Sequence, residues 1–157
     1  MLKSKHLIGL EHFPVSDLNK IIDTSFKFKD ILQTESRKAI LLKGKTVVNM
    51  FFENSTRTKI SFSLAEKRLG ADSINFSAST SSVKKGETLK DTVQNIESMK
   101  IDGAVIRHGH PGSALKLTEY IDGAVINAGD GSHEHPTQAI LDMVTLKEKF
   151  GKIKGLK

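Results

Sequence analysis

Four short polar segments of this sequence carry the side chains that could do chemistry. Each one follows an apolar run, and together they hold hydroxyls, cationic groups and imidazoles. The segments are residues 53–58, 77–86, 107–108 and 127–138. Such groups donate hydrogen bonds and supply positive charge, which is the chemistry that an anionic ligand such as a phosphate requires.

The first segment has the composition of a phosphate site. Ser55 is a natural N-cap for a helix that continues with Thr56, Arg57 and Thr58. The first turn of a helix has unpaired N–H groups and a partial positive charge, and both favour a phosphate. The three hydroxyls and the planar guanidinium add further donors. A capped helix with an exposed arginine is the alternative on this segment alone, and the other three segments favour the binding site.

Further cations follow the second and third apolar runs. Lys84 and Lys85 lie in the polar stretch 77–86, which is longer than the usual connection of about 2–6 residues. A solvated lysine pair is the ordinary alternative for these two. Arg107 ends an apolar run, where an unpaired charge would be costly. We therefore expect Arg107 to meet an anion or a polarised carbonyl.

Two His-x-His pairs raise the possibility of a metal site. The four residues are His108, His110, His133 and His135. Zinc needs three or four convergent ligands, and each pair is interrupted by a loop-type residue, so that no regular face presents both rings. We therefore expect no metal. A neutral His135 at a helix start can instead donate one N–H to a carbonyl oxygen.

The elements that must position these groups alternate along the chain. Apolar, β-branched runs predict strands, and helical spacing predicts helices between them. The expected strands are 46–52, 72–76, 103–106 and 123–126, and the expected helices are 15–34, 56–69, 87–99, 112–121 and 136–149. This order predicts an α/β fold, with an open, mostly parallel four-stranded sheet and helices on both faces. Ligands bind at the carboxyl edge of such a sheet, where all four polar segments would gather.

Length and composition exclude several other classes of protein. The 157 residues fit one domain, and 38% hydrophobic with 27% charged residues is ordinary for a globular chain. The sequence has no Cys, which excludes disulfides, thiolate nucleophiles and Cys-ligated metals. The net charge of +6 suggests an anionic partner, but the scattered basic residues and single Tyr disfavour nucleic acid. We expect a cytoplasmic protein, because no signal or membrane span is evident.

The polar segments resemble known signatures. Phe51–Thr58 and the run His135-Pro136-Thr137-Gln138 resemble the two signatures of the carbamoyltransferase family. Three other runs are similar to the aspartate-specific members: Ser81–Leu89 with Asp91-Thr92, Arg107-His108, and Asn127–Gly131. Ornithine-specific members share the first two signatures, but they lack the Lys-Lys-Gly-Glu-Thr loop and the Asn-Ala-Gly-Asp-Gly run.

The resemblance implies a specific reaction. Members transfer the carbamoyl group of carbamoyl phosphate to L-aspartate in pyrimidine (UMP) biosynthesis, with no metal or organic cofactor. Residue by residue, it implies these roles: Ser55, Thr56, Arg57 and Thr58 hold the phosphate; Arg107, His135 and Thr58 polarise the carbamoyl oxygen; Gln138 holds the carbamoyl NH2; Ser81 and Lys85 reach a site on the neighbouring subunit. The shared site implies a homotrimer, and it leaves open whether regulatory subunits bind.

The resemblance also implies that a second domain is needed. Family chains are about twice as long, and their second half binds aspartate. We therefore expect residues 1–150 to form the carbamoyl-phosphate-binding domain, and 151–157 to begin the lead-in to the first strand of the absent aspartate-binding domain. The chain alone is expected to bind carbamoyl phosphate with little or no turnover. The alternatives are a non-catalytic anion-binding module, an ornithine-type domain and a nucleic-acid-binding protein.

Overall fold

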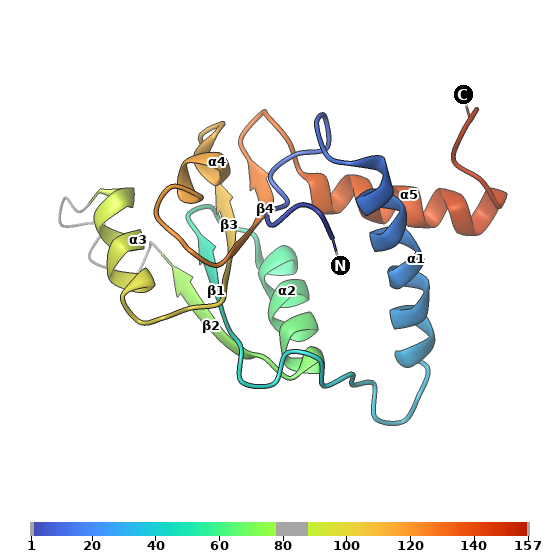
Figure 1. Cartoon of the computed structure of the whole chain (residues 1–157), viewed down its shortest axis with the longest axis horizontal. Coiled ribbons are helices and arrows are strands. Elements are labelled where there is room, and N and C mark those ends of the chain that lie inside the picture. The colour runs from blue at the N-terminus through green and yellow to red at the C-terminus, as the bar shows by residue number, and fades with distance from the viewer. Residues whose placement is uncertain (1, 78–87, 157) are drawn as a thin grey trace.

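A parallel β-sheet runs through the middle of the molecule, with helices against both of its faces (Figure 1). The computed structural model describes residues 2–77 and 88–156. The strands are β1 (Thr46–Phe51), β2 (Asp72–Ser77), β3 (Gly103–His108) and β4 (Ala124–Asp130). Their order in the sheet is β2-β1-β3-β4, and every pair is parallel. The predicted α/β fold with a four-stranded open sheet is confirmed.

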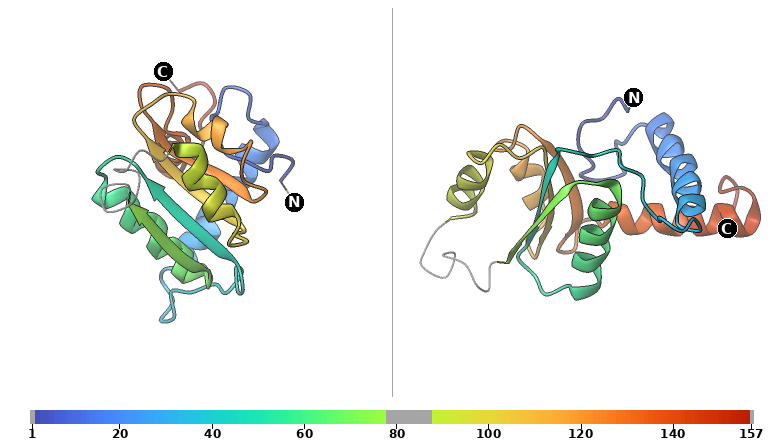
Figure 2. Two further views of the ribbon diagram at one scale, coloured as in Figure 1. Left: turned by 90° about the vertical axis from the view of Figure 1, so that its left-hand side faces the viewer. Right: turned by 90° about the horizontal axis from the view of Figure 1, so that it is seen from below.

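The helices form two layers. They are α1 (Val15–Ile31), α2 (Thr56–Leu69), α3 (Leu89–Glu97), α4 (Ser113–Leu117) and α5 (Pro136–Phe150). Helices α3 and α4 cover one face of the sheet, whereas α2 and α5 lie on the other, and α1 packs against α5 (Figures 1 and 2). Because all strands run in one direction, the N-terminal ends of α2 and α5 come to the same carboxyl edge.

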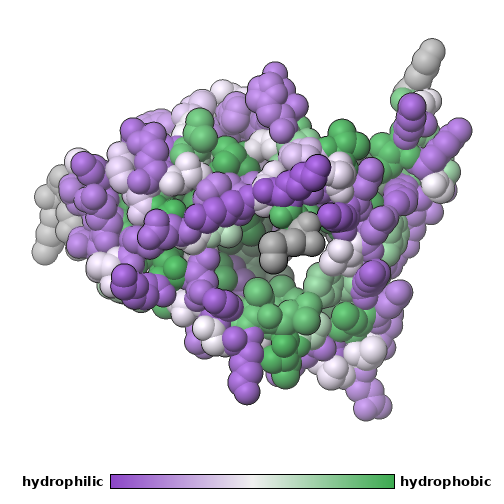
Figure 3. Space-filling view, viewed as in Figure 1, coloured by the Kyte–Doolittle hydropathy of each residue, from purple (hydrophilic) through white to green (hydrophobic). Residues whose placement is uncertain are grey.

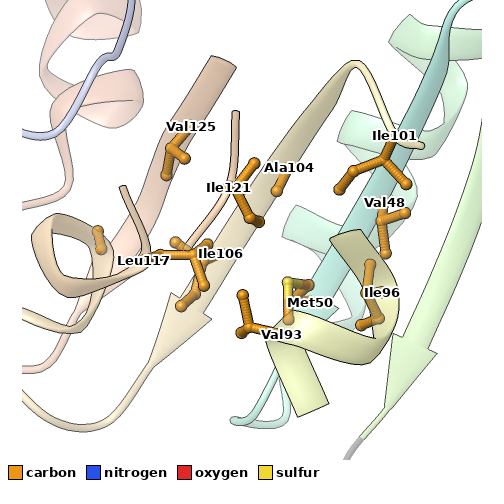
Figure 4. Packing of buried hydrophobic residues seen from close by; sticks show 11 residues of the cluster. Val48, Met50, Val93, Ile96, Ile101, Ala104, Ile106, Leu117, Ile121 and Val125 are labelled. Atoms are coloured by element: carbon orange, nitrogen blue, oxygen red, sulfur yellow. The ribbon is translucent and has the colours of Figure 1, made fainter. Parts of the chain in front are cut away.

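The alternation of side chains along the central strands builds both halves of the core. Successive residues of a strand point to opposite faces. On β1, Val48 and Met50 pack in a cluster with Val93 and Ile96 of α3 (Figure 4). Phe51 belongs to a second cluster, which is packed against α2 on the opposite face. The central strands β1 and β3 are therefore buried on both faces, whereas β4 lies at the edge of the sheet.

β4 differs from its prediction. The strand was expected to end at Ile126, with a loop to follow, but it continues to Asp130. The polar residues do not stop it, because the Asn127 side chain donates to Asp130 Oδ1 at 2.9 Å and both side chains are buried.

An N-terminal residue also pairs along the outer side of β4. Leu7 N–H donates to the Val125 carbonyl at 2.9 Å, and Asn127 N–H donates to the Leu7 carbonyl at 2.8 Å.

α1 is held to α5 by surface ion pairs and leaves a groove beside α2. Lys147 binds Asp23 at 2.7 Å, and Lys29 pairs with Glu148. The groove is mostly apolar and is lined by Phe28, Ile31, Leu32, Arg37, Ala39, Ser61, Leu64, Ala65, Arg68 and Leu69. Figure 3 shows hydrophobic surface in this part of the molecule, near the lower end of α2.

Among residues 2–77 and 88–156, no helix is long and apolar enough to cross a membrane.

Candidate functional site

The N-terminal end of α2 follows β1 directly and presents the first predicted site residues. Ser55 is the N-cap residue, and its carbonyl accepts the first helical hydrogen bond, from Lys59 N–H at 3.0 Å. Within the described part of the chain, the Ser55 hydroxyl makes no capping hydrogen bond, and the first turn holds no acidic residue. The helix start therefore keeps its donors and partial positive charge for an anion.

The N-terminal end of α5 is built around a histidine. His135 is the N-cap residue, and its Nδ1 accepts from Gln138 N–H at 3.4 Å and lies 3.2 Å from the Thr137 hydroxyl. Because Nδ1 is an acceptor, the ring hydrogen of the neutral form sits on Nε2. Burial lowers the pKa of His135, and the charge of Arg107 lowers it further. His135 is therefore a neutral N–H donor at pH 7.

The two helix starts face each other across one cleft. The cleft has a volume of about 500 Å³ and is lined by Arg57, Thr58, Ser61, Phe62, Ala65, His135, Thr137, Gln138 and Leu141. Apart from Ser61, the polar residues come from the N-cap or first turn of a helix, and the apolar ones lie deeper along each helix. Two helix N-termini, a guanidinium and a neutral imidazole donor converge on this space, an arrangement that suits a small anion.

Arg107 reaches the same region from the end of β3. Its Nη1 donates to the Ala128 carbonyl at 2.9 Å, and its Nε lies 3.6 Å from a carboxylate oxygen of Glu53. These contacts with a carbonyl oxygen and a carboxylate agree with the expectation that Arg107 meets an anion or a polarised carbonyl. Arg107 and His135 also line a smaller recess of about 210 Å³ beside the cleft. His135 belongs to both spaces and connects them.

The other histidines have partners of their own. His108 Nδ1 accepts from His110 N–H at 3.0 Å, and the two rings lie 5.0 Å apart. Burial lowers the pKa of His108, with a smaller contribution from His110. His133 Nδ1 lies 3.1 Å from both carboxylate oxygens of Asp130. Among the residues that the structure describes, no three His, Asp or Glu side chains are grouped as a metal site.

Comparison with known proteins assigns the chain to a family. Residues 5–148 match the family model described as the carbamoyl-phosphate-binding domain of aspartate and ornithine carbamoyltransferases. The chain belongs to this family. It is 52% identical over 156 residues to the aspartate carbamoyltransferase catalytic subunit of Christiangramia forsetii, and it is 53% identical over 152 residues to that of Desulfotalea psychrophila. These alignments cover 99% and 97% of this chain, but 50% and 48% of the relatives. The chain thus spans about half the length of these relatives.

Solved structures of the same family share the fold of this carbamoyltransferase domain. The aspartate transcarbamoylase of Trypanosoma cruzi, in complex with carbamoyl aspartate and phosphate, matches with a TM-score of 0.90 at 34% identity. The catalytic subunit of M. jannaschii aspartate transcarbamoylase matches with a TM-score of 0.88 at 41% identity. The matches cover 99% and 98% of this chain, and 48% and 50% of those chains.

The structure brings most of the predicted site residues of this carbamoyltransferase domain together. Arg57, Thr58, His135 and Gln138 line one cleft, and Arg107 adjoins it through the recess. Ser55 and Thr56 stand at the start of α2, but they do not line the cleft. Ser81 and Lys85, with Lys84, lie outside the described residues.

Three residues near the cleft were given no role from the sequence. Glu53 pairs with Arg107. It lies within the run Phe51–Thr58, but the family resemblance implied no role for it. Gly129 leaves room for Arg107 and His135, and its φ of +115° is one that glycine adopts readily. Asp130 binds the two loops beside the site. Each of them follows an apolar run of the sequence, which was the available signal, but key contacts come from other elements, such as Arg107 for Glu53 and Gly112 for Asp130.

Proposed function

We propose that this chain binds carbamoyl phosphate in the cleft between α2 and α5, and that it forms the carbamoyl-phosphate half of an aspartate carbamoyltransferase. The observation that carries the proposal is the convergence of Arg57, Thr58, His135 and Gln138 on one cleft, with Arg107 beside His135. The named relatives support the aspartate-specific reaction over the ornithine-specific one. A structure of the T. cruzi enzyme contains carbamoyl phosphate and aspartate, which supports the ligand assignment.

The two ends of the ligand lie at different helix starts. Its phosphate lies at the start of α2, where Ser55, Thr56, Arg57 and Thr58 supply hydroxyls, backbone N–H groups and a guanidinium. Its carbamoyl group lies toward α5. Gln138 Nε2 donates to Asp142 at 3.1 Å, which leaves the amide oxygen of Gln138 as an acceptor for the carbamoyl NH2.

The chemistry requires positioned donors and no nucleophilic residue. The amino group of aspartate attacks the carbamoyl carbon, and negative charge grows on the carbamoyl oxygen before it passes to the departing phosphate. Arg107, His135 and Thr58 donate to that oxygen, so they stabilise the transition state more than the ground state. One such donor is worth about 3–4 kcal/mol of the barrier in a site that excludes water.

The remaining parts of the enzyme lie outside the described structure. We assign residues 1–150 to the carbamoyl-phosphate domain; α5 ends at Phe150, and Gly151 follows with a left-handed backbone, which supports this boundary. We assign 151–157 to the lead-in of a second domain that binds aspartate. Ser81 and Lys85 complete the site of a neighbouring subunit in a homotrimer. Cytoplasmic pyrimidine biosynthesis is the pathway that this reaction serves.

Calorimetric titration with carbamoyl phosphate tests the binding site. Arg57→Ala removes the guanidinium from the cleft and is expected to weaken binding about 10- to 100-fold, the range for a hydrogen bond to a charged group. Lys67→Ala is the matched control, because it removes one positive charge from the last turn of the same helix. Unchanged affinity in Arg57→Ala contradicts the site, as does equal weakening in both variants.

Two further measurements test the enzyme assignment. The chain alone is expected to produce little or no carbamoyl aspartate, because it spans about half the length of its relatives and we assign aspartate binding to the other half. Near-normal turnover by the isolated chain contradicts this expectation. Sedimentation analysis of a chain extended by the second domain is expected to give a trimer, and a monomer at high protein concentration contradicts the shared site.

A further inference from the structure

One buried carboxylate lies between the two loops that frame the recess. Asp130 is only 1% exposed and stands at the end of β4. Burial alone raises the pKa of a carboxyl, but hydrogen bonds from Asn127, Gly112 and Glu134 outweigh it and hold the pKa of Asp130 below its usual value. Asp130 is therefore a buried carboxylate anion at neutral pH, and its charge is balanced by donors.

The donors come from both loops. Gly112 N–H, in the loop between β3 and α4, donates to Asp130 Oδ2 at 2.9 Å. Glu134 N–H, in the loop between β4 and α5, donates to Oδ1 at 3.2 Å. Asn127 Nδ2 donates to Oδ1 at 2.9 Å, and His133 Nδ1 lies 3.1 Å from each oxygen. One side chain thus joins the loop after Arg107 to the loop before His135.

The same network fixes the backbone around Gly129. Asn127 Oδ1 accepts from Gly129 N–H at 2.9 Å, and Asn127 Nδ2 also donates to the Ile8 carbonyl at 2.8 Å. The loop between β4 and α5 is also tied to the end of β3, because Gly131 N–H donates to the His108 carbonyl at 2.9 Å. Gly129 is the residue against which Arg107 and His135 both lie.

We propose that Asp130 is a positioning residue for carbamoyl phosphate: by holding residues 109–112 and 131–135 together, it sets His135 at its distance from Arg107. Asp130 lines neither the cleft nor the recess, so it acts through these neighbours. The proposal rests on the proposed function for its ligand. The placement of His135 can be measured without any ligand.

Asp130→Asn is the decisive variant. It keeps the shape of the side chain, but it presents an NH2 group to at least one of the N–H donors and leaves that donor unpaired. The expected result is phosphate binding about tenfold weaker, measured by calorimetry with inorganic phosphate. Asp122→Asn is the matched control, because Asp122 is an exposed residue just before the other end of β4. The control is expected to bind phosphate as the wild type does.

The pKa of His135 can be measured by NMR, with its signal assigned by comparison with His135→Gln. The direction in which this pKa changes in Asp130→Asn distinguishes a positioning role of Asp130 from a purely electrostatic effect. Loss of a nearby negative charge by itself lowers the pKa of a histidine. Displacement of the ring from its buried place beside Arg107 raises the pKa toward 6.5, the ordinary value. We expect a rise in Asp130→Asn. A fall, or no change, overturns the positioning role, even where the variant melts at a lower temperature.

The proposed function and the role of Asp130 can fail independently of each other. If the wild type binds neither phosphate nor carbamoyl phosphate, the proposed function fails, and the His135 titration still decides the role of Asp130. If Asp130→Asn does not fold, His133→Ala removes one partner of Asp130 at the surface. It is expected to raise the pKa of His135 and to weaken phosphate binding about two- to threefold, the small effect of losing a partly exposed pair. An unchanged pKa of His135 overturns the proposal.

Discussion

Arg107 and His135 both lie against Gly129, which has no side chain to separate them. A Cβ placed on Gly129 would stand 2.7 Å from Arg107 Nη1 and 3.3 Å from His135 Cδ2. The positive charge of Arg107 is close enough to lower the pKa of His135, in addition to the effect of burial. A cation and a neutral N–H donor thus share one corner of the site: Arg107 lies near the end of β3, and His135 begins the helix that follows the neighbouring strand β4.

Gly129→Ala is expected to disrupt this corner. The backbone of Gly129 has a φ of +115°, and the added methyl group meets the Arg107 guanidinium. Backbone strain of about 1–3 kcal/mol adds to the displacement of Arg107. We expect a lower unfolding free energy and carbamoyl phosphate binding at least about tenfold weaker, measured by denaturation and calorimetry.

Gly151→Ala is the control for backbone strain. Gly151 has a φ of +72°, but a Cβ there meets nothing within 4 Å. The control should lose stability while it keeps its affinity for carbamoyl phosphate. If Gly129→Ala loses no more affinity for carbamoyl phosphate than Gly151→Ala does, then avoiding a contact with Arg107 is not the reason why position 129 needs glycine.

Stability is expected to fall on mild acidification. Burial is the main cause that lowers the pKa of His6, His108 and His135 from 6.5. As the pH falls below 6.5, the unfolded chain takes up protons at these rings that the folded chain does not, so unfolding becomes easier. The stability is fully present above about pH 6.5 and is lost toward the lower folded pKa values. Urea denaturation at about pH 7.5 and 6.0 measures the effect.

His6→Asn isolates one of these contributions. His6 Nδ1 accepts from Val125 N–H at 3.1 Å, and an asparagine oxygen can accept the same bond without titrating. The variant should lose less stability than the wild type between the two pH values. Comparing the two chains cancels Glu66, whose raised pKa acts in the opposite sense. An equal or steeper loss in the variant contradicts the role of His6.

The sequence predicted the sheet and its polar edge because both depend on local patterns. Apolar runs such as 46–52 identified the strands, and the residues after them identified the edge. The pairing of Leu7 with β4 joins residues that are more than a hundred positions apart, so periodicity could not reveal it. The contact of Gly129 with Arg107 and His135 was hidden for the same reason, since it needs the strands already paired.

Glu66 is expected to support the fold without affecting the ligand. It is 6% exposed on α2, its Oε2 accepts from Asn49 Nδ2 at 2.8 Å and from the Ser73 hydroxyl, and burial raises its pKa. Glu66→Leu leaves both donors without this acceptor, at a cost of about 1–3 kcal/mol for each buried group. Carbamoyl phosphate affinity should not change, because Glu66 lies more than two turns from Arg57. Denaturation and calorimetry on the same sample test both statements.

Glu148→Leu is the surface control for Glu66. Glu148 pairs with Lys29 where both side chains are about half exposed, and such pairs contribute about 0–1 kcal/mol. A loss of stability in Glu66→Leu no larger than in this control contradicts the importance of the buried network. Loss of ligand affinity in Glu66→Leu, with the chain fully folded, contradicts its separation from the site.

Salt dependence is expected to distinguish the small-anion site from a nucleic-acid surface. The net charge of +6 could serve either partner. Nucleic-acid binding through about 6–10 phosphate contacts weakens about 10³–10⁵-fold between roughly 50 and 200 mM salt. A dianion in a preformed cleft makes few such contacts, so the carbamoyl phosphate Kd should rise less than about tenfold over the same range.

The competing result would be equally clear. Tight, steeply salt-dependent binding to a DNA or RNA duplex that survives Arg57→Ala would show that the basic surface, and not the cleft, is the binding site. We expect the reverse: binding of carbamoyl phosphate that depends on Arg57, and duplex binding that is absent at about 200 mM salt. This outcome follows from where the donors are, since Arg57, Thr58, His135 and Gln138 gather at one cleft of about 500 Å³ between α2 and α5.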